Sequence, residues 1–207
     1  MLAAETLPTR RRYEKRARAD ATSALRARIL DALLAALQVD DYDLITLNAL
    51  AESAGTTRQT IIRLFGGKDG VLAALFERFD TQVAARRFTA GDGDLAVLAH
   101  CVIDDLEKSG GLVLRLLRQE SRVPIIAQRF AEARKQHLAI LARELAPLLE
   151  RLDPSEAETA LLQARAVTDT LFWNVLRKDM KLDAAAAEAT LLDLLRKIFA
   201  AAKPQPF

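Results

Sequence analysis

The spacing of small and aliphatic residues around Gly55 restricts the fold of this chain more than any other feature of its sequence. Within the stretch Thr46–Leu72, Ala51 precedes the glycine by four positions and Ile61 follows it by six. A glycine can adopt the left-handed conformation that a sharp helix end needs. The alanine lets two helices approach closely, and the isoleucine fills the angle between them. The stretch is therefore predicted to form a helix-turn-helix.

Residue types at fixed offsets across this stretch resemble the DNA-binding motif of the TetR family of transcriptional regulators. They are Ala51, Gly55, Thr57, Thr60, Phe65, Gly66, Lys68 and Leu72. The resemblance implies an all-α fold, with an N-terminal three-helix DNA-binding domain and a C-terminal helical domain for ligand binding and dimerisation. Two positions depart from the family pattern. Ile62 stands where a tyrosine that contacts phosphate is usual, and Leu64 stands where histidine is frequent.

The second helix of the motif, expected over residues 57–64, would enter the DNA major groove with its first turn, as the resemblance implies. Thr56 or Thr57 can cap it. Arginine and glutamine side chains can form paired hydrogen bonds with guanine and adenine, although exposed polar residues outside such a motif would simply be solvated. The resemblance also implies that the lysine opening the next helix, or nearby backbone N–H groups, contacts a phosphate. The predicted DNA-binding residues are Thr46, Thr57, Arg58, Gln59, Thr60, Arg63 and Lys68.

The N-terminal end of the chain is basic, although the whole protein carries a net charge of only +2. Residues 1–28 contain eight basic and three acidic side chains. A basic end on a nearly neutral body favours local contact with a polyanion. Residues 1–20 lack apolar periodicity and are predicted to form a flexible arm that reaches phosphates or the minor groove. A solubilising tail that continues the first helix, expected from residue 22, is the alternative interpretation.

Three segments are predicted along the chain. Residues 1–20 form the basic flexible arm, residues 21–68 the helix-turn-helix domain, and residues 69–207 the helical effector-binding and dimerisation domain. Alanine, leucine, arginine and glutamate favour helices throughout, and glycines and acids at 90–94 predict a linker. Beyond the linker, helices are expected over 94–108, 112–119, 123–152, 154–178 and 183–202.

The second half of the chain offers candidates for a small-molecule effector pocket. Such pockets need apolar walls and few polar groups. The same residues at helical spacing can equally be plain core, so both interpretations stay open. Trp173 and His137 are the preferred candidates, because each is bulky and has a polar tip that needs a partner. The full set is Cys101, Phe130, His137, Asp169, Phe172 and Trp173.

The last two long helices carry more apolar surface than one protomer needs. Two such pairs can form a four-helix bundle across a two-fold axis, as the resemblance also implies. A dimer would place two recognition helices about 34–36 Å apart, one turn of DNA. The candidate interface residues are Leu171, Val175, Leu191, Leu192, Leu195 and Phe199.

The sequence contains no recognisable catalytic set. It has two histidines and one cysteine, with no zinc-binding histidine pair, nucleophile elbow or dinucleotide-binding loop. We therefore expect no enzymatic activity, no cofactor and no metal. A single cysteine rules out an intrachain disulfide, and no apolar run has the length of a membrane span. A cytoplasmic protein without membrane contact is predicted.

The resulting hypothesis is a homodimeric repressor that binds a palindromic operator on double-stranded DNA and is released by a small-molecule effector. An activator or an effector-independent regulator with the same fold is one alternative. A helical ligand-binding or protein-interaction module without operator binding is another.

Overall fold

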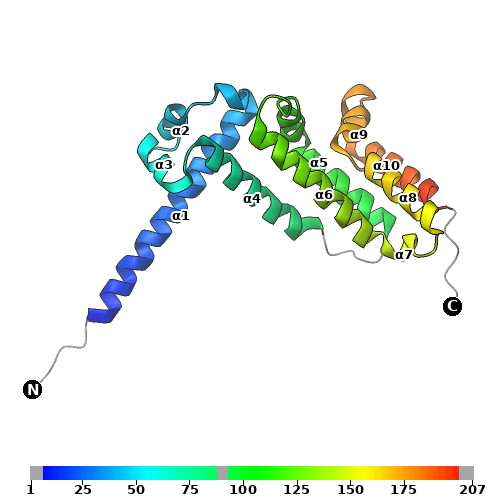
Figure 1. Ribbon diagram of the computed structural model, residues 1–207, viewed down its shortest axis with the longest axis horizontal. Helices are drawn as coiled ribbons and strands as arrows, with labels where there is room; N and C mark the ends of the chain where they lie inside the picture. The colour runs from blue at the N-terminus through cyan, green and yellow to red at the C-terminus, as the bar shows by residue number, and fades with distance from the viewer. Residues whose placement is uncertain (1–6, 88–92, 201–207) are drawn as a thin grey trace, which may run out of the picture. The chain divides into compact units, whose positions relative to one another are not determined.

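The computed structural model describes residues 7–87 and 93–200, with side chains described for residues 16–80 and 93–200 (Figure 1). Within these ranges the chain consists of helices and connecting turns without a strand, so the predicted all-α fold is confirmed. The chain forms two compact units, Met1–Arg78 and Phe79–Phe207. The division falls inside helix α4 (Lys68–Arg87), which contributes residues to both units.

The first unit contains α1 (Leu7–Val39), the short 3-10 helix η1 (Tyr42–Leu44), α2 (Leu47–Ser53), α3 (Arg58–Phe65) and the first half of α4. Leucine and isoleucine recur on α1 at the three- and four-residue spacing that puts side chains on one helix face. Helix α1 packs against α2, and α2 packs against α3. The largest fully buried side chains of this core are Ile29, Leu33, Leu37, Leu50, Ile61, Leu72 and Leu75.

Helix α1 begins at Leu7, well before the predicted start at residue 22. The expected flexible arm is therefore wrong from residue 7 onward, and Figure 1 shows this part of α1 extending beyond α2 and α3. The physical reason is that Pro8 occupies the first turn, where its missing N–H costs nothing, and strong helix formers follow it. Neither glycine nor proline occurs again before Gly55. Residues 1–6 lie outside the described residues.

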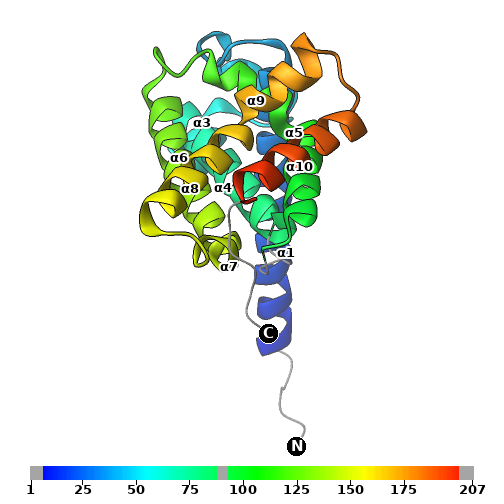
Figure 2. The same ribbon diagram turned by 90° about the vertical axis from the view of Figure 1, so that its right-hand side faces the viewer.

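The second unit contains seven further helical segments. They are α5 (Leu95–Leu117), α6 (Pro124–Glu144), α7 (Ala146–Leu149), α8 (Pro154–Val167), α9 (Thr170–Asn174), the π-helical turn η2 (Val175–Asp179) and α10 (Ala184–Ile198). Helix α8 packs on both α6 and α10, and α10 packs on α5 (Figure 2). The core between them is made by Ala99, Val102, Ile103, Leu106, Leu141, Leu145, Ala164, Trp173, Leu176, Leu191, Leu195 and Phe199.

Helix α5 runs unbroken through the two glycines that were expected to end it near residue 110. Gly110 is buried against the indole of Trp173, where an added Cβ would lie 2.6 Å from a ring carbon. The glycine therefore serves helix packing rather than chain reversal. The Trp173 indole N–H donates to Glu107 of the same helix at 2.7 Å.

The helix predicted over 154–178 is interrupted at Thr168, which ends α8. The hydroxyl of Thr168 donates to the carbonyl oxygen of Ala164 at 2.8 Å, and the N–H of Thr168 donates to the same oxygen at 3.1 Å. Asp169 then caps α9 by accepting from the N–H of Leu171 at 2.9 Å. The break is therefore made by two side chains that cap opposite helix ends.

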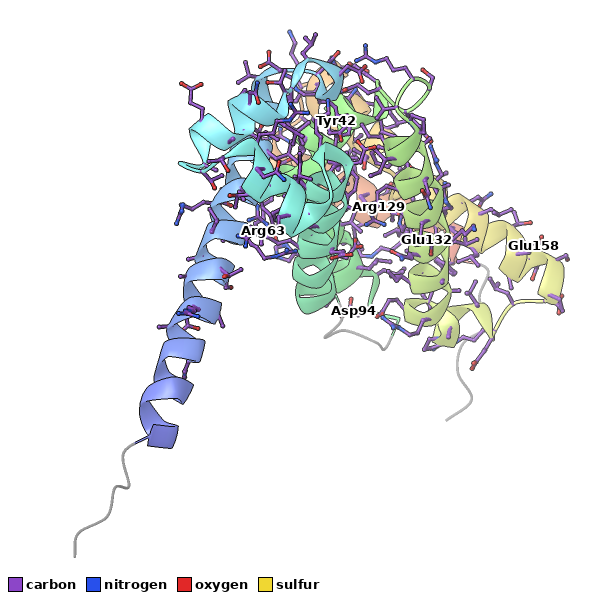
Figure 3. All side chains as sticks on the ribbon, turned by 60° about the vertical axis from the view of Figure 1, so that its left-hand side comes forward. Tyr42, Arg63, Asp94, Arg129, Glu132 and Glu158 are labelled. Carbon is purple, nitrogen blue, oxygen red and sulfur yellow. The ribbon has the colours of Figure 1, made fainter. Side chains whose placement is uncertain are left out.

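Two ion pairs tether α4. Arg78 bonds Asp31 of α1 at 2.7 Å inside the first unit. Asp80 pairs with Arg129 of α6 inside the second unit, and Arg129 is labelled in Figure 3. No helix within 7–87 and 93–200 combines the length and hydrophobicity that a bilayer crossing requires.

Candidate nucleic-acid interface

The turn between α2 and α3 has the predicted construction. Gly55 has a φ of +61°, in the left-handed region. Immediately after it, the N–H of Thr56 donates to the carbonyl oxygen of Ala51 at 2.9 Å, which closes the end of α2. Ala51 and Ile61 are both buried, Ile61 completely. The turn thus fixes α3 against α2, because Ala51 lets the two helices approach closely and Ile61 fills the angle between them.

Threonines cap both helices of the motif. The Thr46 hydroxyl oxygen accepts from the N–H of Ala49 at 3.1 Å at the start of α2. The Thr57 oxygen accepts from the N–H of Thr60 at 3.2 Å and lies 2.9 Å from the Thr60 hydroxyl. Of the two threonines that could cap α3, Thr57 does so. These caps fix the first turn of α3, the part that would meet a base edge.

The outer face of α3 carries the exposed side chains of Arg58, Gln59 and Arg63, the last labelled in Figure 3. Thr60 and Ile62 are half-buried on the same short helix. The arrangement presents two guanidinium groups and one amide in a rigid setting. Such groups can hydrogen-bond to base edges and phosphates.

Lys68 points inward rather than toward a phosphate. Its ammonium donates to the carbonyl oxygens of Tyr42 at 2.8 Å and Ile45 at 2.9 Å. It also lies 4.3 Å from the centre of the Tyr42 ring, a cation–π contact. Lys68 thus braces the start of α4 against η1, and a phosphate contact by Lys68 or by nearby backbone N–H groups stays a prediction. The charge of a lysine at a helix N-terminus, unfavourable by itself, is offset by these carbonyl dipoles.

Tyr42 of η1 makes a further contact with the start of α4. The phenol is buried and donates a short hydrogen bond to Asp69. Burial first, and the bond to the Asp69 carboxylate second, raise the pKa of Tyr42 above its usual range. The phenol therefore stays neutral wherever the first unit is folded at ordinary pH.

Two arginines of α1 hold the ends of the motif helices. Arg26 donates to the carbonyl oxygen of Leu64 at 2.7 Å, near the C-terminus of α3. Arg28 donates to the carbonyl oxygen of Ala54 at 3.4 Å, at the end of α2. Cations are favourable at helix C-termini, where carbonyl groups lack helical partners. In the sequence both residues looked like part of the basic end, and no local signal separates them from it.

Glycines make the connection between α3 and α4. Gly66 ends α3 in the left-handed conformation, with a φ of +81°. Gly70 sits in the first turn of α4, where an added Cβ would overlap the carbonyl oxygen of Phe65. Helix α4 can therefore start this close to α3 only because residue 70 has no side chain. No local pattern in the sequence indicates this role, because the clash is with the main chain of the preceding helix.

Two of the six predicted pocket residues, Cys101 and His137, line a cavity between α5 and α6 of about 30 Å³. His137 Nε2 lies 3.0 Å from the Thr168 hydroxyl, which links α6 to the end of α8. The other four lie elsewhere. Trp173 is in the core, Phe172 packs against that core, and Asp169 caps α9, while Phe130 is half-buried on α6.

The predicted dimer residues differ in the fraction of each side chain that is exposed within one protomer. Leu191, Leu195 and Phe199 are at most 6% exposed within a single protomer, so they are core residues and not interface residues. Leu192 is half-buried. Leu171 and Val175 are 59% and 42% exposed, and Leu162 of α8, absent from the prediction, is 55% exposed. Within the described part of the chain, no group of three histidine, cysteine or acidic residues could hold a metal ion.

Comparison with known proteins agrees with this geometry. The family model described as "Bacterial regulatory proteins, tetR family" matches residues 29–75, which cover α2, α3 and their turn. A search of curated proteins gives no match.

Solved structures with low sequence identity share the fold of the chain. A transcriptional regulator from Rhodococcus sp. Rha1 has a TM-score of 0.68 at 18% identity, over 87% of this chain and 99% of that one. The fatty acid degradation regulator FadR from Bacillus halodurans has a TM-score of 0.61 at 23% identity, over 82% of this chain and 93% of that one. Residues 29–75 of the chain therefore form the DNA-binding domain of the tetR family of bacterial regulatory proteins.

Proposed function

We propose that this protein is a homodimeric repressor that binds a palindromic operator and leaves it when a small molecule binds the second unit. The observation that carries the proposal is the exposed face of α3. Arg58, Gln59 and Arg63 stand on a helix whose two ends are fixed by the Thr57 cap and by Arg26. A rigid helix with free hydrogen-bonding side chains is what direct readout of a major groove requires.

Phosphate contacts would orient this face on the duplex. The hydroxyls of Thr46, Thr57 and Thr60 lie at the starts of α2 and α3, where they can donate to phosphate oxygens. Of the two candidates for a phosphate contact here, the backbone N–H groups at the start of α4 would make it, and Lys68 would hold that turn in place. Arg16 and Arg18 are exposed on α1 and would add salt-dependent contacts outside the core site.

A second copy of the chain would cover the exposed leucines of α8 and α9. Leu162 and Leu171 are large, apolar and more than half exposed, which favours burial against a partner. A shallow groove of about 300 Å³ lies between α8 and the end of α10 and would add to the contact area if the partner reached it. An isologous interface there would impose two-fold symmetry on the pair of α3 helices and so on the operator.

Release by an effector needs a connection between the two units, and α4 supplies it because it belongs to both. A ligand that changes how the second unit holds α4 would change the spacing of the two recognition helices. By linkage, operator DNA would weaken ligand binding by the same factor. Binding to operator DNA would also agree with the predicted cytoplasmic location of the protein.

Selection from a pool of random duplex DNA, followed by sequencing of the retained molecules, tests the proposal. An enriched palindrome with half-sites one DNA turn apart would support a dimeric repressor. Enrichment of a single half-site would contradict the dimer, and no enrichment at low salt would contradict operator binding.

A further inference from the structure

We propose that the cavity between α5 and α6 selects a molecule with an apolar body and a protonated amine, and discriminates against carboxylates. This inference rests on the proposed function, because it names the class of effector for the second unit. The cavity is lined by Leu98 and Val102 of α5 and by Ile140, Leu141 and Leu145 around the end of α6. These walls suit an aliphatic or aromatic body.

The present cavity holds about 30 Å³, which is room for about one water molecule. A ligand must therefore separate side chains of α5 from those of α6. Val97, at its edge, is 37% exposed and offers a route from solvent. The side chains that would move are flexible aliphatic groups rather than backbone, so the seam can open without breaking helical hydrogen bonds.

The charges around the cavity decide the class of ligand. The ionisable residues that line it are Asp94, Cys101, His137 and Glu144, and no lysine or arginine is among them. The Asp94 carboxylate caps α5 through the N–H groups of Ala96 at 2.8 Å and Val97 at 3.2 Å. Glu144 is the other carboxylate of the lining and is held by a side chain that does not line the cavity.

Glu144 is only 8% exposed, and its Oε1 accepts from the guanidinium of the adjacent Arg143 at 2.9 Å and 3.1 Å. Arg143 itself is 63% exposed and does not line the cavity. A buried carboxylate is costly unless it is paired. An ammonium group inside the cavity would give Glu144 a second partner, whereas a carboxylate ligand would add an unfavourable like charge.

Three probes share one apolar body and differ in the charge of their polar group: 4-phenylbutylamine, 4-phenylbutanol and 4-phenylbutyrate. They separate the contribution of the apolar body from that of the charge. Their binding to the full chain is measured by isothermal titration calorimetry without DNA. The amine is expected to bind at least about tenfold more tightly than the carboxylate, with the alcohol between them.

Substitutions then locate the selectivity. Glu144→Gln keeps the shape of the side chain and is expected to weaken amine binding about tenfold while leaving the alcohol unchanged. The matched control is Glu132→Gln, an acid on the same helix with a 54% exposed side chain, labelled in Figure 3, which should change nothing. Arg143→Gln frees Glu144 and should strengthen amine binding, so the inference stays testable even if Glu144→Gln does not fold.

A carboxylate that binds as tightly as the amine would overturn the inference, as would equal effects of the Glu144 and Glu132 substitutions. Absence of binding by all three probes would also overturn it. Since the titrations contain no DNA, they are independent of the operator selection. A protein that enriches a palindrome but shows no amine preference would retain the proposed function and lose only this inference.

Discussion

Arg26 stacks over the ring of Phe65, with its guanidinium carbon 4.2 Å from the ring centre. The same guanidinium donates to the carbonyl oxygen of Leu64. A residue in the middle of α1 thus holds the C-terminal end of the recognition helix by a hydrogen bond and a cation–π contact.

Replacement of Arg26 by alanine should lower the free energy of unfolding of the first unit by about 1–2 kcal/mol, because one helix-end bond and one cation–π contact are lost. Urea unfolding followed by circular dichroism measures the change, and hydrogen exchange of residues 58–65 localises it. Arg18→Ala, an exposed arginine on the same helix, should stay within about 0.5 kcal/mol of the parent. Equal losses from the two substitutions would contradict the capping role.

Gly70→Ala should destabilise the protein by more than about 2 kcal/mol, since the new Cβ overlaps the Phe65 carbonyl oxygen. Gly111→Ala is the control, because nothing lies within 4 Å of a Cβ there and the glycine is inside α5. It should stabilise the chain by about 0.5–1 kcal/mol. Thermal unfolding of both variants decides the matter, and a stable Gly70→Ala protein would mean that α4 can start elsewhere.

Alkaline pH should unfold the first unit through Tyr42. Its pKa is raised by burial and by Asp69, whereas in the unfolded chain it is about 10. Stability is therefore fully present below pH 10 and falls as pH rises above it, by up to about 1.4 kcal/mol per unit, because only the unfolded state loses the proton. Tyr42→Phe should remove this slope. The measurement is the urea midpoint of the parent and of Tyr42→Phe between pH 8 and pH 11. A parallel loss of stability in the two proteins would contradict the role of Tyr42.

Arg58→Ala and Gln59→Ala should each reduce discrimination between the selected operator and a scrambled duplex, by roughly 1–3 kcal/mol for each lost paired contact. Gln38→Ala, an exposed amide on α1, is the control and should bind as the parent does. Fluorescence anisotropy at several salt concentrations separates lost specificity from a lost phosphate contact. Unchanged discrimination in both α3 variants would place the readout on another face.

Leu162→Glu should give a folded monomer, because this leucine is exposed in one protomer and would be buried by a second. Leu195→Glu should instead unfold the second unit, since Leu195 is fully buried within one protomer. Sedimentation velocity and circular dichroism distinguish the outcomes. A dimer that survives Leu162→Glu would exclude this face, and a folded Leu195→Glu monomer would reverse the assignment of core and interface.

The turn of the motif was predictable because its determinants are local. Gly55, Ala51 and Ile61 act within ten residues of one another, so their spacing in the sequence is also their geometry. Thr57 likewise bonds an N–H three residues away. Residue type and spacing along the chain are enough to predict such local features.

Contacts between distant segments were not predictable. Lys68 finds its carbonyl partners 26 and 23 residues earlier, and Arg26 finds Leu64 38 residues later. A basic residue has the same local signature whether it meets a phosphate or a carbonyl oxygen. Only the path of the intervening chain separates the two outcomes.

Three of the six interface candidates are core residues for a related reason. Helical periodicity reports that α10 has an apolar face, but not which neighbour covers it. Leu191 and Leu195 lie on the covered side, whereas Leu162 and Leu171, on shorter elements, remain exposed. The two helices expected over 94–108 and 112–119 are one helix, α5, in which Gly110 makes room for the distant Trp173.

The ion pairs of α4 have a consequence for the conditions under which the protein can respond. Arg78 and Asp80 are two residues apart on α4, and each pairs with a charge of its own unit, Arg78 with Asp31 and Asp80 with Arg129. The carboxylates of both pairs are well exposed, at 66% and 45%, so dissolved salt screens both tethers. Salt also weakens DNA binding, because binding releases counterions and this release is less favourable at high salt. Rising ionic strength is therefore expected to weaken DNA binding and the two ion pairs of α4 together.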